Sequence, residues 1–454
     1  MAAVKYYSTN GKAEKVSFGE ALLKGLAPDR GLYMPDSIPL LDIATLNSMQ
    51  GMTYADIAFA VARNFLGGEI GDEELDTLLK EAYTFEVPLE KVFERNYIMR
   101  LDQGPTASFK DFAARVMGRL MQYFLKKQNR NMLILTATSG DTGSAIANAF
   151  YGLEHIQVVV LYPETEVTPR QRKQMTTLRQ NIRIIAIDGK FDDCQALVKQ
   201  AFSDPNLDYL GLSSANSINI GRLIPQSFYY FYAWSQLATG INDPVIFAVP
   251  SGNFGNMMGG LLAKKMGLPV KRIVIATNEN DEVPRYWQTG RYATLVPSRN
   301  CISSAMNVGH PSNMARVVSL YGGKMDEKGN ILKEPDTLQM QSDIFAISIS
   351  DKQTIETLKE TYMKYQVLTE PHGAAGWAGL MAYRRMHPSD ALPGQLAVSL
   401  ETAHPAKFPE EIIRVLGVDP ELPPCMEGLD KREESFDLLK NDYAQFREYL
   451  TAHY

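Results

Sequence analysis

Short runs of consecutive apolar residues alternate with segments of helical apolar spacing from residue 130 onward. The apolar runs fall at 131–138, 156–163, 182–188 and 210–216, and again at 244–252, 270–278, 343–350 and 394–402. Helical spacing occupies segments between the first runs, at 144–151, 169–179 and 192–202. This alternation is typical of parallel sheets that are covered on both faces. The sequence therefore predicts an α/β protein with two open, mainly parallel twisted sheets flanked by helices.

The same pattern suggests three parts along the chain. Residues 1–95 mix short helical patterns with turns and predict an N-terminal mixed extension packed on the larger domain. We expect a smaller α/β domain at 96–240 and a larger one at 241–454. Residues 301–340, which are rich in Gly, Ser and Asn, suggest a long loop region. The charged tail from Asp419 is expected to be mostly helical and to pack on the surface.

One predicted helix carries a lysine in an unfavourable place. From Phe109 to Phe124 the apolar residues recur at helical spacing, and Thr106 and Ser108 are candidate N-caps. Lys110 then stands at the helix N-terminus, where the helix dipole disfavours a positive charge. The ordinary interpretation is a surface lysine that reaches into water.

Two strand-to-helix turns have a design suited to anions. They are "TATSGDTGSA", with Gly140 and Gly143, and "AVPSGNFGN", with Gly252 and Gly255. Glycines there let the backbone turn tightly and expose N–H groups beside a helix N-terminus, although each turn could also be a plain tight connection. A third cluster follows the strand predicted at 210–216 and contains Asn216, Ser217, Asn219 and Arg222. Arg222 offers a planar fork for phosphate or carboxylate, and a surface ion pair is the alternative.

Composition and charge exclude several classes of protein. The 454 residues carry a net charge of −6, which argues against a general nucleic-acid binder. No apolar run approaches the 18 residues that a membrane span needs. The three isolated cysteines predict a reducing, cytoplasmic location. Motifs of zinc proteases, P-loop proteins and dinucleotide-binding folds are absent, and we expect no metal site.

Six motifs in order carry a resemblance to a known family. They are "GPTASFKDFAAR", "TATSGDTGSA", "NSINIGRLIPQ", "PSGNFGN", "EPHGAAGW" and "TAHPAKFP", and "KVSFGEALLKGLAPDRGLYMP" precedes them. From Lys15 to about Pro409 the chain resembles the threonine synthase family, which belongs to the tryptophan-synthase-β-like pyridoxal phosphate (PLP) enzymes of fold type II. The resemblance implies PLP as the cofactor, bound in the larger domain.

The resemblance also implies roles for individual residues. It implies that Lys110 forms a Schiff base with PLP and that Thr402 faces the pyridine nitrogen. The cofactor phosphate would lie against Gly252, Asn253, Phe254, Gly255 and Asn256. The substrate would contact Ser139, Asp141 and Thr142, and its phosphate would contact Asn216, Ser217 and Arg222. Many members of the wider class have asparagine where this chain has Asp141, and an ionised carboxylate cannot donate to the cofactor's phenolate oxygen. Asp141 is therefore expected to contact a cationic group such as the lysine amine.

These roles imply a reaction in which O-phospho-L-homoserine and water become L-threonine and phosphate by γ-elimination and β-hydration. Lys110 would move the protons, with its pKa lowered by its position, and Arg222 would steady the departing phosphate. A serine/threonine dehydratase is the nearest alternative, and a catalytically inactive ligand-binding relative is another. His372 and His404 are expected to have structural or supporting roles, and the segment His310–Asn313 is a further loop candidate. We expect a monomer or homodimer that binds small molecules and neither nucleic acid nor membranes.

Overall fold

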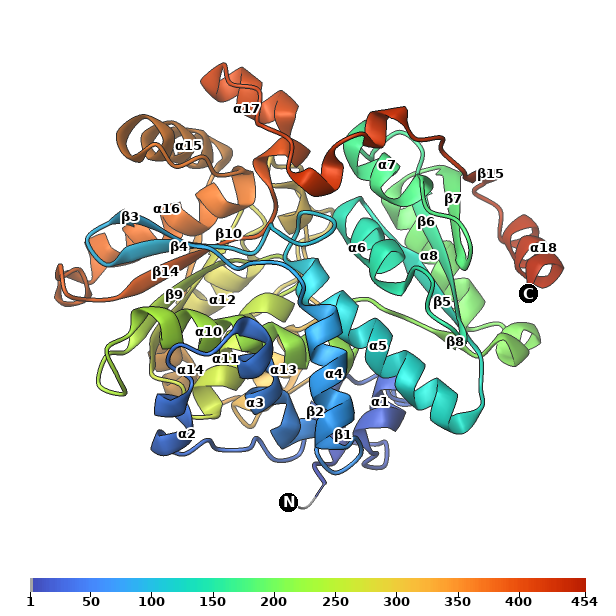
Figure 1. Ribbon diagram of the computed structural model, residues 1–454, viewed down its shortest axis with the longest axis horizontal. Coiled ribbons are helices and arrows are strands. Elements are labelled where there is room, and N and C mark those ends of the chain that lie inside the picture. Colours follow the sequence, from blue (N-terminus) through green and yellow to red (C-terminus); the bar gives the residue numbers. More distant parts are fainter. Residues whose placement is uncertain (1–2) are drawn as a thin grey trace.

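Two sheets lie side by side in the computed structural model, which describes residues 3–454 (Figure 1). The smaller sheet has five parallel strands in the order β15-β7-β6-β5-β8. The strands are β5 (Met132–Ala137), β6 (Ile156–Pro163), β7 (Ile182–Asp188), β8 (Leu212–Ser213) and β15 (Asp437–Lys440). Because successive side chains of a strand point to opposite faces of the sheet, each strand contributes side chains to two hydrophobic cores. One core includes Ile134 and Val160, and the other includes Leu135 and Val159.

Helices cover both faces of the smaller sheet, as continuous apolar strands require. On one face lie α5 (Lys110–Gln128), α6 (Asp141–Phe150) and α7 (Pro169–Thr176). On the other lie α8 (Phe191–Phe202) and α18 (Tyr443–His453). Connections include the short 3-10 helix η1 (Pro205–Leu210).

The larger sheet has six strands in the order β13-β10-β9-β14-β4-β3. All neighbours are parallel except the hairpin of β3 (Leu89–Phe93) and β4 (Asn96–Arg100). The other strands are β9 (Val245–Pro250), β10 (Val270–Thr277), β13 (Ile344–Ser348) and β14 (Ala397–Glu401). One face packs on α16 (Pro371–Met386), which has α15 (Asp351–Tyr365) outside it. The opposite face packs on α11 (Gly255–Lys265), and further helices of this lobe are α9 (Ile220–Leu223), α10 (Phe228–Leu237), α12 (Glu282–Thr289) and α17 (Pro409–Leu416).

The N-terminal part forms a mixed extension beneath both sheets in the view of Figure 1. It pairs β1 (Tyr6–Ser8) with β2 (Tyr33–Pro35) in antiparallel orientation. Its helices are α1 (Phe18–Lys24), α2 (Ile43–Ser48), α3 (Tyr54–Leu66) and α4 (Asp72–Ala82). The architecture confirms the predicted fold class.

The sheets divide the chain differently from the expected boundaries at residues 95 and 240. β3 and β4 join the larger sheet, although β4 falls within the expected smaller domain. β15 and α18 join the smaller lobe, because β15 pairs in parallel with β7 and α18 packs on α8. The tail from Asp419 contains a helix, α18, as expected, but β15 also adds an edge strand to the smaller sheet, which we did not expect. The region 301–340 is not one long loop either, since it holds α13 (Met314–Leu320), β11 (Lys324–Met325), β12 (Ile331–Lys333) and the start of α14 (Thr337–Asp343).

Candidate active site

The loops after four strands carry most of the predicted site residues. β5 and β8 of the smaller sheet lead into residues 138–141 and 214–219. β9 and β14 of the larger sheet lead into residues 251–254 and 402–407. Ligands of open α/β sheets bind at the carboxyl ends of parallel strands. The sequence motifs therefore lie where this fold normally holds a ligand.

Lys110 is the first residue of α5 and follows a tightly held loop. Neither Thr106 nor Ser108 caps the helix, whose N-cap residue is Phe109. Instead, Asp111 accepts hydrogen bonds from the Thr106 backbone N–H at 2.9 Å and hydroxyl at 2.6 Å. The loop is also tied to the end of β14, because the Phe109 N–H donates to the Thr402 carbonyl at 2.9 Å. The Lys110 side chain keeps only 13% of its surface exposed, which excludes the surface lysine interpretation.

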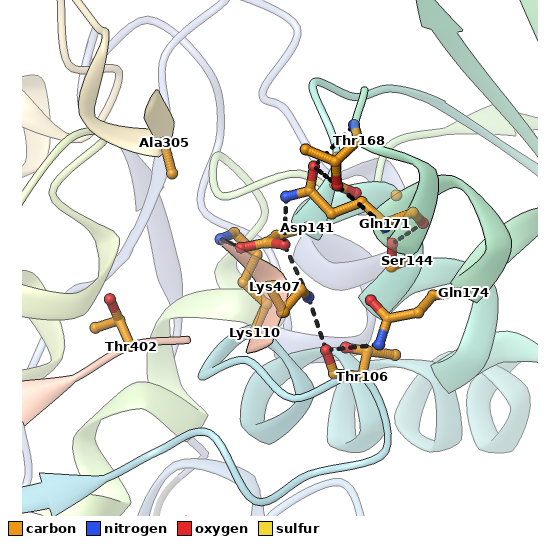
Figure 2. A network of polar contacts seen from close by, with 12 residues as sticks. Thr106, Lys110, Asp141, Ser144, Thr168, Gln171, Gln174, Ala305, Thr402 and Lys407 are labelled. Atoms are coloured by element: carbon orange, nitrogen blue, oxygen red, sulfur yellow. Dashed lines mark hydrogen bonds and ion pairs between the residues drawn. The ribbon is translucent and has the colours of Figure 1, made fainter. Parts of the chain in front are cut away.

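The Lys110 amine faces the carboxylate of Asp141, and a second lysine shares that carboxylate (Figure 2). Lys110 Nζ lies 3.8 Å from Asp141 Oδ2. Lys407 Nζ lies 2.8 Å from Asp141 Oδ1, and the Lys407 side chain is completely buried. Gln171 Nε2 donates to the same Oδ1 at 2.9 Å. Asp141 thus contacts cationic groups, as we expected for a carboxylate at a position where many members of the wider class have asparagine.

Burial and neighbouring charges shift the pKa values of this group. Burial lowers the pKa of Lys110, Asp141 opposes that shift, and Lys407 and Arg222 add to it. Burial by itself would raise the pKa of Asp141, but Lys407 and Lys110 hold it well below its usual range. The carboxylate is therefore ionised, and the Lys110 amine is more easily deprotonated than a lysine in water.

The turn from Ser139 to Thr142 differs from a simple anion cradle. The Thr138 hydroxyl accepts from the N–H groups of Gly140 at 2.9 Å and Gly143 at 2.8 Å. Two of the expected N–H donors are therefore used inside the turn. Ser139 is exposed and Thr142 is half-buried, so both remain accessible beside Asp141.

The turn after β9 has the free donors that the first turn lacks. Within residues 3–454, the N–H groups from Gly252 to Met257 find no protein acceptor. Phe254 adopts a left-handed conformation with φ of 63°, which turns the chain into α11. Asn256 is buried, and its Oδ1 accepts from the hydroxyls of Tyr229 and Tyr230 at 2.7 and 2.8 Å. These bonds fix the amide so that its unpaired Nδ2 adds another donor to the loop.

Arg222 is buried on α9 and donates to the Ala215 carbonyl at 2.9 Å. Among the described residues its Nε has no acceptor, and burial lowers its pKa to about 10. The loop before it is held by Arg316, whose Nη1 donates to the Ser217 carbonyl at 3.1 Å. Asn313 connects this loop to the β9 turn, because its Nδ2 donates to the Asn253 carbonyl at 2.9 Å and to the Ser217 carbonyl at 3.4 Å.

Thr402 follows β14 and lies apart from the Lys110 group in Figure 2. Its hydroxyl is 3.5 Å from Glu370 Oε1. Glu370 also accepts from His372 Nδ1 at 2.5 Å, and His372 Nε2 accepts from the Ala305 N–H at 3.0 Å.

His404 Nδ1 accepts from the Ala406 N–H at 3.2 Å, and His310 contacts the Tyr292 hydroxyl at 2.8 Å. Each of the three histidines, His372, His404 and His310, is therefore held in place by a hydrogen-bond partner.

Comparison with known proteins identifies the family. The model described as "Threonine synthase N terminus" matches residues 5–83, "Pyridoxal-phosphate dependent enzyme" matches 87–400, and "Threonine synthase, C-terminal" matches 378–450. The chain is 42% identical over 451 residues to threonine synthase from Haemophilus influenzae, covering 98% of this chain and 99% of the relative. The chain belongs to the threonine synthase family.

Solved structures of threonine synthases have the same architecture. The PLP-bound enzyme from Brucella melitensis superposes with a TM-score of 0.93 at 35% identity, covering 99% of both chains. The yeast enzyme gives a TM-score of 0.90 at 30% identity, again covering 99% of both chains. The protein is thus a PLP-dependent lyase of this family, and its cofactor is PLP.

The residues present fit PLP. Consecutive free N–H groups at a helix N-terminus, together with the buried unpaired Asn256 amide, match the acceptor-rich phosphate of the cofactor. A buried amine of lowered pKa, Lys110, suits the covalent attachment of an aldehyde.

No helix among residues 3–454 has the length and apolar character of a membrane span, and this part of the chain holds no cluster of three metal-ligating side chains.

Sequence reasoning gave no role to Lys407, Gln171 or Glu370, and it included Asn313 only in the loop candidate His310–Asn313. Lys407 and Glu370 lie inside the motifs "TAHPAKFP" and "EPHGAAGW" that carried the resemblance. A lysine inside such a motif was the available signal. Gln171 comes from a segment without a motif and Asn313 from that loop candidate, and only the folded chain brings them to Asp141 and Ser217.

Proposed function

We propose that this protein converts O-phospho-L-homoserine and water to L-threonine and phosphate, with Lys110 as the catalytic base. The observation that carries this proposal is the largely buried Lys110 amine facing Asp141, together with free anion-binding donors on two loops that Asn313 connects. PLP when bound supplies the electron sink that such an elimination and replacement needs.

The chain's own residues then hold the reactants and move the protons. Lys110 Nζ takes the proton from the substrate's α-carbon and assists the proton transfer at the β-carbon, because its lowered pKa supplies free amine. Gly252, Asn253, Phe254, Gly255 and Asn256 hold the cofactor phosphate, and Thr402 presents its hydroxyl to the pyridine ring. A hydroxyl leaves the ring nitrogen neutral, which favours elimination and replacement over transamination.

A second anion site distinguishes this substrate from serine or threonine. Arg222, with Asn216 and Ser217, holds the substrate phosphate, and the unpaired Arg222 Nε supports this role. Ser139, Asp141 and Thr142 face the rest of the substrate. A serine/threonine dehydratase needs no second phosphate site, so the Arg222 cluster argues against that alternative.

The test is the release of phosphate and formation of L-threonine from O-phospho-L-homoserine by the purified protein. Keto acid formed only from serine or threonine would overturn the proposal. Borohydride reduction followed by peptide mapping should place the cofactor on Lys110, and labelling of another residue would overturn the role of Lys110. Lys110→Ala should remove all activity, and Lys126→Ala is a matched control on the last turn of the same helix.

The location and assembly of the protein are further parts of the proposal. We infer a cytoplasmic protein because Cys194, Cys301 and Cys425 are all free thiols. We also infer that it acts as a monomer or homodimer, which sedimentation measurements would determine.

A further inference from the structure

Three charged side chains from different parts of the chain meet at the junction of the two lobes, and we call them the Lys110–Asp141–Lys407 row (Figure 2). Asp141 opens α6 after β5 of the smaller sheet. Lys407 ends the 3-10 helix η5 (Pro405–Lys407), which follows β14 of the larger sheet. The row therefore joins the lobes directly at the amine that we assign to catalysis.

The two oxygens of Asp141 have unequal surroundings. Oδ1 accepts from Lys407 at 2.8 Å and from Gln171 at 2.9 Å. Oδ2 faces Lys110 at 3.8 Å, which is longer than a hydrogen bond. The carboxylate is therefore paired mainly with Lys407, and its hold on Lys110 is the weaker one.

Lys407 is itself fixed in place. It is completely buried and donates a second hydrogen bond to the Thr106 carbonyl at 2.7 Å. Thr106 belongs to the loop that precedes Lys110, and Gln174 donates to the same carbonyl at 3.1 Å. The Lys407 ammonium thus touches both Asp141 and the loop that positions Lys110.

We propose that Lys407 is a positioning residue for the reaction, because it engages Asp141 and so prevents this carboxylate from holding Lys110 in the ammonium form. The inference rests on the proposed role of Lys110 and adds a residue to which sequence reasoning gave no role. Lys407 acts on Lys110 by pairing with Asp141 and by its own nearby positive charge, and it contacts no reacting atom in this scheme.

The charges around Lys110 support this division of roles. Asp141 from α6 and Glu370 from the start of α16 raise the pKa of Lys110, while Lys407 and Arg222 lower it beside the larger effect of burial. Removal of the Lys407 charge would leave two carboxylates against one cation, and it would also release Oδ1 of Asp141. Removal of the Asp141 charge would have the opposite effect on Lys110.

The test measures the Lys110 amine itself in the full-length protein after PLP has been removed. Trace acetylation with isotopically labelled acetic anhydride, read by peptide mass spectrometry across pH, gives the protonation midpoint of Lys110. Lys407→Met should move the midpoint to higher pH and reduce the labelling rate at pH 8 about fivefold. Asp141→Asn should move the midpoint to lower pH, and Lys407→Arg should stay near the original protein. An unchanged or lower midpoint in Lys407→Met would overturn the proposal.

A second comparison avoids an unpaired buried carboxylate, in case Lys407→Met does not fold. The proposal predicts that Asp141→Asn/Lys407→Met has a higher Lys110 midpoint than Asp141→Asn, because a nearby positive charge has been removed. Equal midpoints in these two folded variants would show that Lys407 is only structural. Because acetylation reports the amine without PLP or substrate, its outcome is independent of the phosphate-release assay that tests the proposed function.

Discussion

The Arg222 side chain is buried, and its Nε donor has no acceptor among the described residues. The planar shape of the guanidinium group should therefore matter for binding as much as its charge. We predict that Arg222→Lys raises the KM for O-phospho-L-homoserine by about 10- to 100-fold, because a lysine lacks the planar fork that pairs with two phosphate oxygens. Steady-state kinetics with phosphate detection will measure the change. PLP affinity should stay the same, since we propose that the cofactor phosphate binds to the loop from Gly252. An unchanged KM would show that Arg222 does not bind the substrate phosphate.

His404 gives a pH dependence of stability. Burial, together with Arg100 and Lys407, lowers its pKa to about 4, while an unfolded histidine titrates near 6.5. The unfolded chain therefore binds this proton first as the pH falls, and stability is lost between about pH 6.5 and 4. With a discount for the partly exposed ring, we expect a loss of about 1 kcal/mol between pH 7 and 5.

Urea unfolding at the two pH values measures this loss. His404→Asn keeps an acceptor for the Ala406 N–H and should show a smaller pH-dependent loss than the original protein. Equal losses in both proteins would assign the effect to other groups.

Single residues also show where sequence reasoning stops. Lys110 was identified because a lysine at a helix N-terminus is unusual and lies in a specific motif. Its partner Lys407 lies almost 300 residues away, and no local pattern signals that the two lysines share one carboxylate. The chemistry of Asp141 was predictable from its charge, but the identity of its main partner required the tertiary structure.

At the scale of elements, the turn between β5 and α6 depends on a close approach at Gly143. A Cβ atom there would lie 2.4 Å from Thr138 Cγ2 and 2.9 Å from Val160 Cγ1. We predict that Gly143→Ala destabilises the protein by about 1–3 kcal/mol and lowers activity, because Thr138 must move and Asp141 moves with the turn. Thermal unfolding and kinetics will measure both effects. Gly394→Ala is the control, since no heavy atom lies within 4 Å of its Cβ position, and an equal effect there would contradict the prediction.

Elements differ in how well the sequence predicted them. β6 and β7 match their predicted limits, because both are continuous apolar runs buried on two faces. β8 has only two residues, Leu212 and Ser213, because the chain turns into the loop of residues 214–219 directly after them. β15 was missed because it is an edge strand in which only Leu439 is buried, and it therefore lacks an apolar run.

At the scale of the whole molecule, the C-terminal segment completes the core of the smaller lobe. Phe446 on α18 is completely buried in the cluster that includes Leu197 of α8. We predict that Phe446→Ala lowers the free energy of unfolding by about 3–5 kcal/mol. Leu438→Ala on β15, where the side chain is 59% exposed, should cost less than about 1 kcal/mol. Urea unfolding compares the two, and equal losses would show that α18 only covers the surface.

The division into lobes could be predicted from sequence only in outline. Alternating strands and helices indicate two parallel sheets, but they do not show which strands are neighbours. β4 pairs with β14, and β15 pairs with β7, so both sheets contain partners from distant parts of the chain. Such pairings depend on which edges the earlier strands leave free, and this is a property of the folded molecule.

These long-range pairings have a consequence for synthesis on the ribosome. β4 ends at residue 100 and can pair with β14 only after the ribosome has passed residue 397, where β14 begins. In the same way, β7 can pair with β15 only after residue 437 has been added. At about 5–20 residues per second, roughly 300 residues take on the order of 15 to 60 seconds to translate. During that time β4 has an open edge, and a chain truncated before residue 397 lacks both the β14 strand and the Lys407 segment. The larger sheet can therefore be completed only after the segment of β14 has been made, and the smaller sheet only after that of β15.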